Sequence, residues 1–294
     1  MIDKLEDPEN LVKQRRAIQK ITLLPSIPPM LQKIIQISAD PSSSAEDLQK
    51  TIEKDQSIAA AILRLANSAY YGYSREVSDI KNAIVIIGFK TSVSIAISVS
   101  VLKTMSAQFT GKEFDKNEFW KHTIATGEAA RLIAIKTGYS NSSQAYIIGL
   151  LHDIGKVVLH FLNGRDFEDA VFDARAMDEP LHKFETQIFG FDHQTAGSWL
   201  GDRWKLPLSI ISGIQYHHNI KSCPKDHLMD ALIAHVANYS AKTAKLGDSG
   251  DRQIPRLSTY VKSKLHLDNQ KLKEISTELE KKREEIDLYL ETIL

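Results

Sequence analysis

Histidine and aspartate side chains near the middle of the chain have the types and spacing of a metal site. The stretch "GLLHDIGKVVLH" (149–160) sets His152 and Asp153 side by side between two apolar runs, and Lys156 follows them. Imidazole nitrogens suit zinc, iron, nickel and similar metals, and a carboxylate can bridge two ions. Either the pair holds a metal ion and supports hydrolysis, or it is a remnant without a chemical role in a protein that only binds partners.

Further histidines recur on both sides of this pair. The ordered set includes His122, His193 and the adjacent pair His217 and His218. Each histidine alone is more often structural than a ligand, but ligands from several helices can converge in the core of a helix bundle. We therefore predict a metal centre built from this set. We expect structural roles for the other histidines of the same chain, among them His160, His182, His227 and His266.

Composition narrows the class of protein. The chain has 294 residues, 43% of them hydrophobic, which suits a folded globular protein with a sizeable core. Lys plus Arg and Asp plus Glu are equal at 37 each, so there is no overall charge to attract nucleic acid or an anionic membrane. The single cysteine, Cys223, excludes an internal disulfide framework, and the charged start "MIDKLEDPEN" is no secretory signal. We expect a cytoplasmic protein.

The most apolar run, "AIVIIGFKTSVSIAISVSVL" (83–102), is about long enough to span a bilayer. Gly88, Lys90 and several serines interrupt it. We therefore predict a pair of buried helices with a break or close contact at Gly88, and no membrane span.

Apolar spacing predicts helices along most of the chain. Helical faces recur in 31–39 and in "IAAAILRLANSAYYG" (58–72), which Gly72 is expected to end. Ser44, with Asp47 three residues on, predicts a capped helix start. No stretch shows the period-two alternation of a strand bounded by hairpin turns, so we predict an all-α fold.

The composition changes after Pro255, where the chain becomes highly charged. A heptad series of apolar residues runs through this part: Leu265, Leu272, Leu279, Ile286 and Ile293. Such a pattern fits an amphipathic helix docked on the body of the protein. It also fits a helix that dimerises, although Asp268 and Lys282 interrupt the companion series.

Several segments together resemble the HDOD family, the HD-related output domains of bacterial signalling. They run from about Leu24 to about Ala241 and are "LPSIPPMLQKI", "ILRLANSAYYG", "AIVIIGF", "FWKHTIATGEAARLIA", "AYIIGLLHDIGKVVL", "FGFDHQTAGSWLGDRWKLP" and "IQYHH". The resemblance implies an HD-domain-like helical bundle with an additional N-terminal helical subdomain. We accordingly divide the chain into an N-terminal helical part (1–110), an HD-like part carrying the histidines (111–250) and a C-terminal amphipathic extension (251–294).

The resemblance also assigns roles at the site. In the related HD-GYP phosphodiesterases a histidine comes first, and His122 matches it. His152 and Asp153 match the histidine–aspartate doublet of those enzymes, and Lys156 matches the lysine that follows the doublet. The later histidines of that pattern are matched by His193, His217 and His218. Two metals sharing Asp153 would take His122 and His152 on one side and the later three histidines on the other. Asp153 and Lys156 are the residues expected to support any catalysis.

Two departures from that pattern weaken the case for catalysis. Asn238 stands where the closing aspartate is expected, and an asparagine ligates without negative charge. The GYP signature after the histidine pair is absent, which disfavours hydrolysis of cyclic dinucleotides. Glu118 falls where some of those enzymes have a further metal-binding glutamate, and we expect it to be a supporting or surface residue here.

Two hypotheses follow for the function, and they leave open whether the protein is an enzyme. The first is a signalling output or scaffolding module with a partly retained metal site, no or weak catalysis, and signalling proteins as partners. The second is a metal-dependent phosphohydrolase acting on a nucleotide or phosphate ester. Either would hold one divalent ion, iron, zinc, nickel or manganese, with room for a second that binds weakly. A homodimer is a further expectation, and nucleic acid is not an expected partner.

Overall fold

The computed structural model describes residues 8–73, 75–106 and 113–293, and these residues form helices and 3₁₀ turns without a strand. This confirms the all-α prediction. The first helices are α1 (Pro8–Ile21), α2 (Pro29–Ala39), α3 (Ala45–Ile52), α4 (Gln56–Ala66), α5 (Ile80–Ile87) and α6 (Phe89–Met105). The central helices are α7 (Lys116–Thr137), α8 (Ser142–Leu151), α9 (Ile154–Leu162), α10 (Gly164–Met177), α11 (Leu181–Phe189), α12 (His193–Arg203), α13 (Leu208–Tyr216) and α14 (Leu228–Thr243). The last are α15 (Thr259–Lys264), α16 (Asn269–Lys281) and α17 (Arg283–Ile293).

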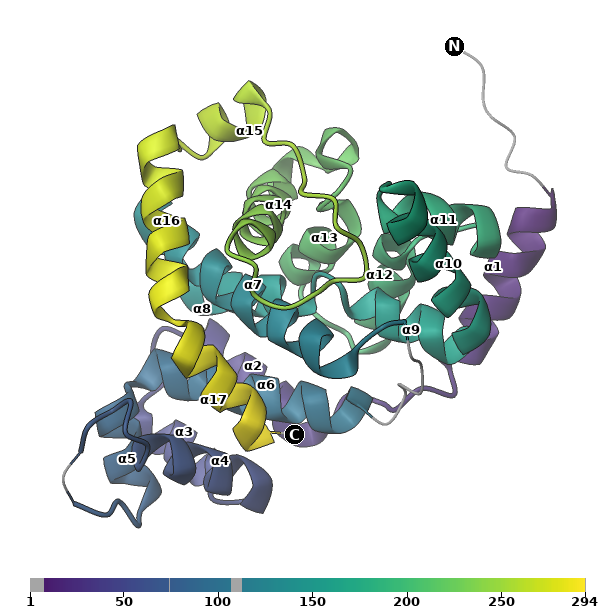
Figure 1. The fold of residues 1–294 in the computed structure, drawn as a ribbon. Helices are drawn as coiled ribbons and strands as arrows, with labels where there is room; N and C mark the ends of the chain where they lie inside the picture. Colours follow the sequence, from purple (N-terminus) through teal and green to yellow (C-terminus); the bar gives the residue numbers. More distant parts are fainter. Residues whose placement is uncertain (1–7, 74, 107–112, 294) are drawn as a thin grey trace.

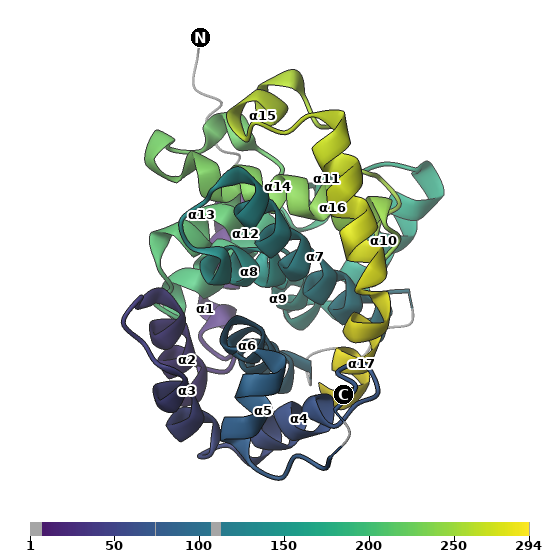
Figure 2. The same ribbon diagram turned by 90° about the vertical axis from the view of Figure 1, so that its left-hand side faces the viewer.

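The helices gather into two groups, which meet where α2 and α6 pack on α8. Helices α2 to α6 lie together at one end, and α7 to α14 form the larger bundle (Figures 1 and 2). Helices α16 and α17 run down the side of the molecule, so that α17 contacts α4, α6 and α7. Helix α1 packs on α9, α11 and α12, away from the helices that follow it in the chain. The division into three parts stays a prediction.

Local signals place the first helices. Pro29 opens α2, and Ser44 and Asp47 form the predicted capping box at the start of α3. The prediction for the next helix was too long, because α4 ends at Ala66. Gly72 instead occupies a turn beyond the helix with a φ of 60°. The apolar residues after Ala66 belong to that turn, whose backbone a continuous helix could not form.

Helices α5 and α6 are the predicted buried pair. Gly88 joins them with a φ of 90°, and their axes differ in direction by 111°. A second stretch, Ser142–Leu162, is long and apolar enough to cross a membrane, and 89% of it is buried inside the fold. A core helix meets the same criterion of length and composition, so burial explains both apolar runs.

The C-terminal heptad residues up to Ile286 pack on the body of the chain, and the side chain of Ile293 lies outside the described part. Leu265, Leu279 and Ile286 are fully buried, and α16 contacts α7 and α14. Lys282 interrupts the helix between α16 and α17, which lets the apolar face follow the curved side of the molecule. This is the docked arrangement, and the apolar stripe is used within the chain.

A buried polar cluster fastens α17 to both groups of helices. The Glu285 carboxylate accepts hydrogen bonds from Tyr70 (3.0 Å), Tyr71 (3.0 Å) and Tyr289 (2.7 Å). Lys282 lies 2.6 Å from Glu285 and 3.4 Å from Glu128 of α7. Burial raises the pKa of Glu285, but Lys282 and these hydrogen bonds outweigh it and hold the pKa below 4.5. The "NSAYYG" turn thus supplies hydroxyl groups to the C-terminal helix.

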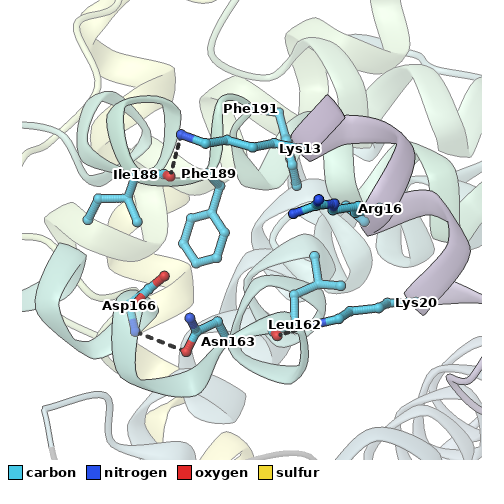
Figure 3. Close-up of a pocket in the computed structure, with 10 residues that line it drawn as sticks. Lys13, Arg16, Lys20, Leu162, Asn163, Asp166, Ile188, Phe189 and Phe191 are labelled. Carbon is cyan, nitrogen blue, oxygen red and sulfur yellow. Dashed lines mark hydrogen bonds between the residues drawn. The ribbon is translucent and has the colours of Figure 1, made fainter. Parts of the chain in front are cut away.

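Basic residues of α1 hold the ends of two helices of the larger bundle. The Lys13 ammonium donates to the Ile188 carbonyl at 3.5 Å, and Lys20 donates to the Leu162 carbonyl at 3.3 Å (Figure 3). Carbonyls at helix C-termini lack partners in their own helix and favour cations. The cavity of about 290 Å³ between these lysines, which Phe189 also lines, is therefore part of a structural clamp.

Candidate metal centre

The predicted ligands come from six helices or their ends, the sixth being α14 with Asn238. His122 lies inside α7, and His152 and Asp153 form the turn between α8 and α9. His193 is the first residue of α12, and His217 directly follows α13. These helices pack in the pairs α7 with α8, α9 with α12, and α12 with α13. Residues spread over about a hundred positions are thereby brought to one point in the core.

Asp153 is the centre of the cluster. It occupies the N-cap position of α9, yet its side chain makes no capping hydrogen bond. One carboxylate oxygen, Oδ2, lies 3.3 Å from His152 Nε2 and 3.9 Å from His122 Nε2. The other, Oδ1, lies 3.3 Å from His193 Nε2 and 3.5 Å from His217 Nε2. The carboxylate therefore divides its two oxygens between two sets of imidazoles.

Two groups with metal-ligand spacing share this carboxylate. His122, His152 and Asp153 form one, and Asp153 with the later three histidines, His193, His217 and His218, forms the other. Within each group the potential ligand atoms lie within 4.8 Å of one another. A carboxylate in this position can bridge two ions, so the geometry accommodates one ion on either side of Asp153.

Hydrogen bonds on the outer side of three rings fix which nitrogen faces the centre. His152 Nδ1 lies 2.7 Å from the Gly149 carbonyl, and His217 Nδ1 lies 2.8 Å from the Ile214 carbonyl. His193 Nδ1 lies 2.6 Å from the Glu185 carboxylate. Carbonyl and carboxylate oxygens only accept hydrogen bonds, so each Nδ1 carries the proton. In a neutral ring the Nε2 lone pair then points inward.

The centre consequently contains more electron pairs than protons that could join them, since a proton on His193 Nε2 can serve only one of its two neighbours, His217 Nε2 and Asp153 Oδ1. His193 Nε2 and His217 Nε2 are 3.3 Å apart, and both approach Asp153 Oδ1. His152 Nε2 and Asp153 Oδ1 are buried without a hydrogen-bond partner in the described part of the chain. Converging lone pairs and a carboxylate repel one another unless a cation lies between them. The residues present fit a divalent metal ion.

Burial and the neighbouring charges shift the pKa values of the side chains in the cluster. Burial lowers the pKa of His217 to about 3, and burial with His152 nearby takes that of His122 well below 6.5. Burial raises the pKa of Asp153, but His152 and Lys156 outweigh it and hold it well below 3.8. Burial lowers the pKa of His193, but Glu185 and Asp153 raise it to about 9. A proton on His193 therefore competes with a metal ion for the same nitrogen.

Glu185 is a supporting residue that the sequence analysis missed. Its carboxylate accepts hydrogen bonds from the ring and from the backbone nitrogen of His193, at 2.6 and 2.9 Å. A carboxylate on the outer nitrogen of a ligating histidine fixes the ring and strengthens it as a ligand. The available signal was a glutamate within the apolar face of α11, between Phe184 and Ile188.

Lys156 is buried, with only 2% of its surface exposed. Its ammonium group donates to Asp153 Oδ2 at 2.7 Å and to the Ser249 carbonyl at 2.8 Å. Burial lowers its pKa, but Asp153 and Asp251 outweigh it and the pKa is raised. Lys156 is therefore not a solvated lysine at the surface of its helix. The ammonium neutralises Asp153 and is turned away from solvent.

A segment beyond α14, Leu246 to Asp251, packs against α7 at Glu118 and His122. The Asp248 backbone nitrogen donates to the Glu118 carbonyl at 3.0 Å. Gly247, with a φ of 78°, lies so close to α7 that a Cβ there would overlap the Glu118 oxygen and the His122 nitrogen. The Glu118 side chain is exposed, so its backbone, and not its carboxylate, contributes here.

Asn238 and His218 complete the predicted set. Asn238 is 1% exposed on α14, which packs on α7 and α8, and its Oδ1 has no hydrogen-bond partner among the described residues. The structure thus leaves this oxygen available as a ligand, which stays a prediction. His218 is the one member of the two ligand groups that is only partly buried.

Comparison with known proteins identifies the fold. The family model for the HDOD domain matches residues 24–220. A Treponema pallidum (strain Nichols) protein named only as uncharacterized is 26% identical over 240 residues, 81% of this chain but 45% of that relative. The chain thus spans less than half of that protein's length.

Solved structures agree with the architecture. An HDOD domain protein of unknown function from Geobacter sulfurreducens superposes with a TM-score of 0.80 at 24% identity, over 97% of this chain and 98% of its own. A candidate signal transduction protein from Marinobacter aquaeolei VT8 gives 0.82 at 19% identity, over 99% and 67%. A candidate phosphohydrolase from Shewanella amazonensis SB2B gives 0.71 at 22% identity, over 95% and 98%. At these identities the likeness shows the fold alone.

Proposed function

Since this chain belongs to the HDOD family, we propose that it is a bacterial signalling module built around a buried divalent metal centre, with little or no hydrolytic activity of its own. The convergence of imidazole lone pairs on Asp153 supports the metal. The enclosure of that centre supports a non-catalytic or weakly catalytic role.

The donor set suits iron, zinc, nickel or manganese. The stronger site combines Asp153 with three histidines, one of which Glu185 orients. The weaker site combines His122, His152 and Asp153 with the neutral oxygen of Asn238. When bound, a divalent ion makes water more acidic and polarises a phosphoryl oxygen, the chemistry that a phosphohydrolase uses.

Access to the centre separates the two candidate functions. The six residues of the cluster other than His218 are at most 1% exposed: His122, His152, Asp153, His193, His217 and Asn238. A phosphate ester must reach the metal and a nearby cation for hydrolysis. Here Lys156 is committed to Asp153 and Ser249, and the segment around Gly247 covers the His122 side. The hydrolase would need that segment to move, or a substrate that reaches the metal past the partly buried His218.

Signalling proteins are the partners that this role requires, and a second copy of the chain is a further candidate. The equal numbers of acidic and basic residues favour protein partners over nucleic acid. The single cysteine supports a cytoplasmic location.

The test combines metal content with hydrolysis of bis(p-nitrophenyl) phosphate by the metal-loaded protein. We expect the wild type and the His227→Ala variant to bind metal. We expect the turnover of the wild type to be no faster than that of a double variant that carries both His227→Ala and His152→Ala. His227 is a control because it pairs with Asp230 outside the cluster. Turnover that the single variant retains and the double variant loses would establish the phosphohydrolase instead.

A further inference from the structure

Two cavities border the metal centre at His218. One has a volume of about 430 Å³ and lies between the start of α11, α14 and the residues Asp251 and 253–256. The other, of about 370 Å³, lies between the end of α13, the 3₁₀ turn Ile220–Ser222, α14 and the start of α15. They share the side chains of His218, His235 and Arg256, so they are two halves of one groove.

Charge distinguishes the two halves. In the larger cavity Lys183 lies 2.6 Å from Glu179, and Lys242 forms an ion pair with Asp251. Two of its three cationic side chains are thus paired with acids in the same wall, and the third is the shared Arg256. The smaller cavity is lined by Lys221 and Arg256 and by no carboxylate. In a chain of zero net charge, this half of the groove is a local excess of positive charge.

The smaller cavity also presents an aromatic ring. Tyr260, in the first turn of α15, lines it and is 48% exposed. Asn219 and Ser258 add polar groups to the wall. A volume of this size is in the range of small-molecule sites, which is about 300–1,000 Å³. Lys264 Nζ lies over this ring, 5.7 Å from its centre. Cations beside a half-exposed aromatic ring match a ligand that carries both a phosphate and a flat base.

We infer that this cavity binds a nucleoside phosphate, with the phosphate held by Arg256 and Lys221 and the base against Tyr260. The inference deepens the proposed function, since it names the class of small molecule that the signalling module senses. Only its signalling purpose rests on that proposal, because the binding contacts need no metal.

The position of the groove gives binding a route to the centre. His218 belongs to both the cavity wall and the ligand group of Asp153. His235, the other shared residue, places Nδ1 2.7 Å from the His217 carbonyl and Nε2 3.3 Å from the Arg256 carbonyl. A ligand that moves Arg256 or His218 therefore acts on the metal ligands directly. By linkage, metal occupancy and ligand affinity then depend on each other.

The experiment is isothermal titration calorimetry of the full chain with AMP, GMP and adenosine. We expect AMP or GMP to bind at least about tenfold more tightly than adenosine, because charge-assisted hydrogen bonds hold the phosphate. Arg256→Ala should remove this preference, and Tyr260→Ala should weaken nucleotide binding by about tenfold through the lost stacking. Arg252→Ala is the matched control, since Arg252 is exposed on the same segment but lines neither cavity.

Three results overturn the inference: no binding of AMP or GMP at millimolar concentration, equal affinity for adenosine, or equal effects of Arg256→Ala and Arg252→Ala. Circular dichroism checks that each variant is folded. Metal content, measured on the same samples, keeps the two proposals separate. Nucleotide binding by a protein without metal would support the cavity and contradict the metal centre, and metal without nucleotide binding would do the reverse.

Discussion

Replacing Gly247 by alanine tests whether the segment after α14 seals the metal centre. Two effects add at this position. A φ of 78° disfavours any residue with a Cβ, at about 1–2 kcal/mol. The new Cβ also overlaps backbone atoms of Glu118 and His122, which no side-chain rotation can relieve. Relieving such an overlap typically lowers the free energy of unfolding by about a further 1–3 kcal/mol.

Gly138→Ala is the matched control for the backbone effect. Gly138 ends α7 with a φ of 73°, and a Cβ there meets nothing within 4 Å. We therefore expect about 1–2 kcal/mol for Gly138→Ala and about 2–5 kcal/mol for Gly247→Ala. For a chain of this size, 1 kcal/mol lowers Tm by roughly 2 °C. The expected losses are about 2–4 °C and about 4–10 °C.

The functional readout is the rate at which the metal-loaded protein loses its ion to EDTA. Displacing the segment exposes the His122 side and removes the Ser249 carbonyl from Lys156, so Gly247→Ala should release metal about tenfold faster than Gly138→Ala. Equal release rates in the two variants, with Gly247→Ala folded, would refute the idea that this segment is the seal.

The other predictions concern Glu185, Glu285 and Asn238. Glu185→Gln should weaken metal binding by about 10- to 100-fold in a chelator competition, because His193 loses its charged partner, whereas Glu179→Gln on the surface should not. Glu285→Gln should cost about 1–3 kcal/mol in urea unfolding at pH 7. Because the folded pKa of Glu285 is depressed, its stabilisation is present above 4.5 and is lost as the pH falls, so the variant and wild type should converge in acid. Asn238→Asp should tighten metal binding by adding a charge to the weaker site, and unchanged affinity would place Asn238 outside it.

Sequence patterns predicted the helices well where local chemistry fixes them. The box of Ser44 and Asp47 and the break at Gly88 depend on neighbours within a few residues. The end of α4 was misjudged because Ala- and Tyr-containing sequence is compatible with both helix and turn. What decides it is tertiary: Tyr70 and Tyr71 reach Glu285, more than two hundred residues away.

At the site, too, some features could be predicted from local sequence and others depend on tertiary contacts. The histidines and Asp153 could be predicted from residue type, order and resemblance to a known family. Glu185 and the Gly247 segment could not, because each acts only through a contact formed by folding. The prediction that Lys156 supports catalysis assumed that its ammonium group can reach a substrate. Its burial against Asp153 depends on the packing of α9 and on the carbonyl of Ser249.

The most direct test of the metal centre is elemental analysis of the freshly purified protein beside an Asp153→Asn variant, with circular dichroism as the check on folding. The account predicts near-stoichiometric iron, zinc, nickel or manganese in the wild type. It predicts roughly tenfold less metal, or lower still, in the variant, because Asp153 contributes to both ligand groups. Folded wild-type protein that stays without metal even after anaerobic loading with iron or manganese would contradict it.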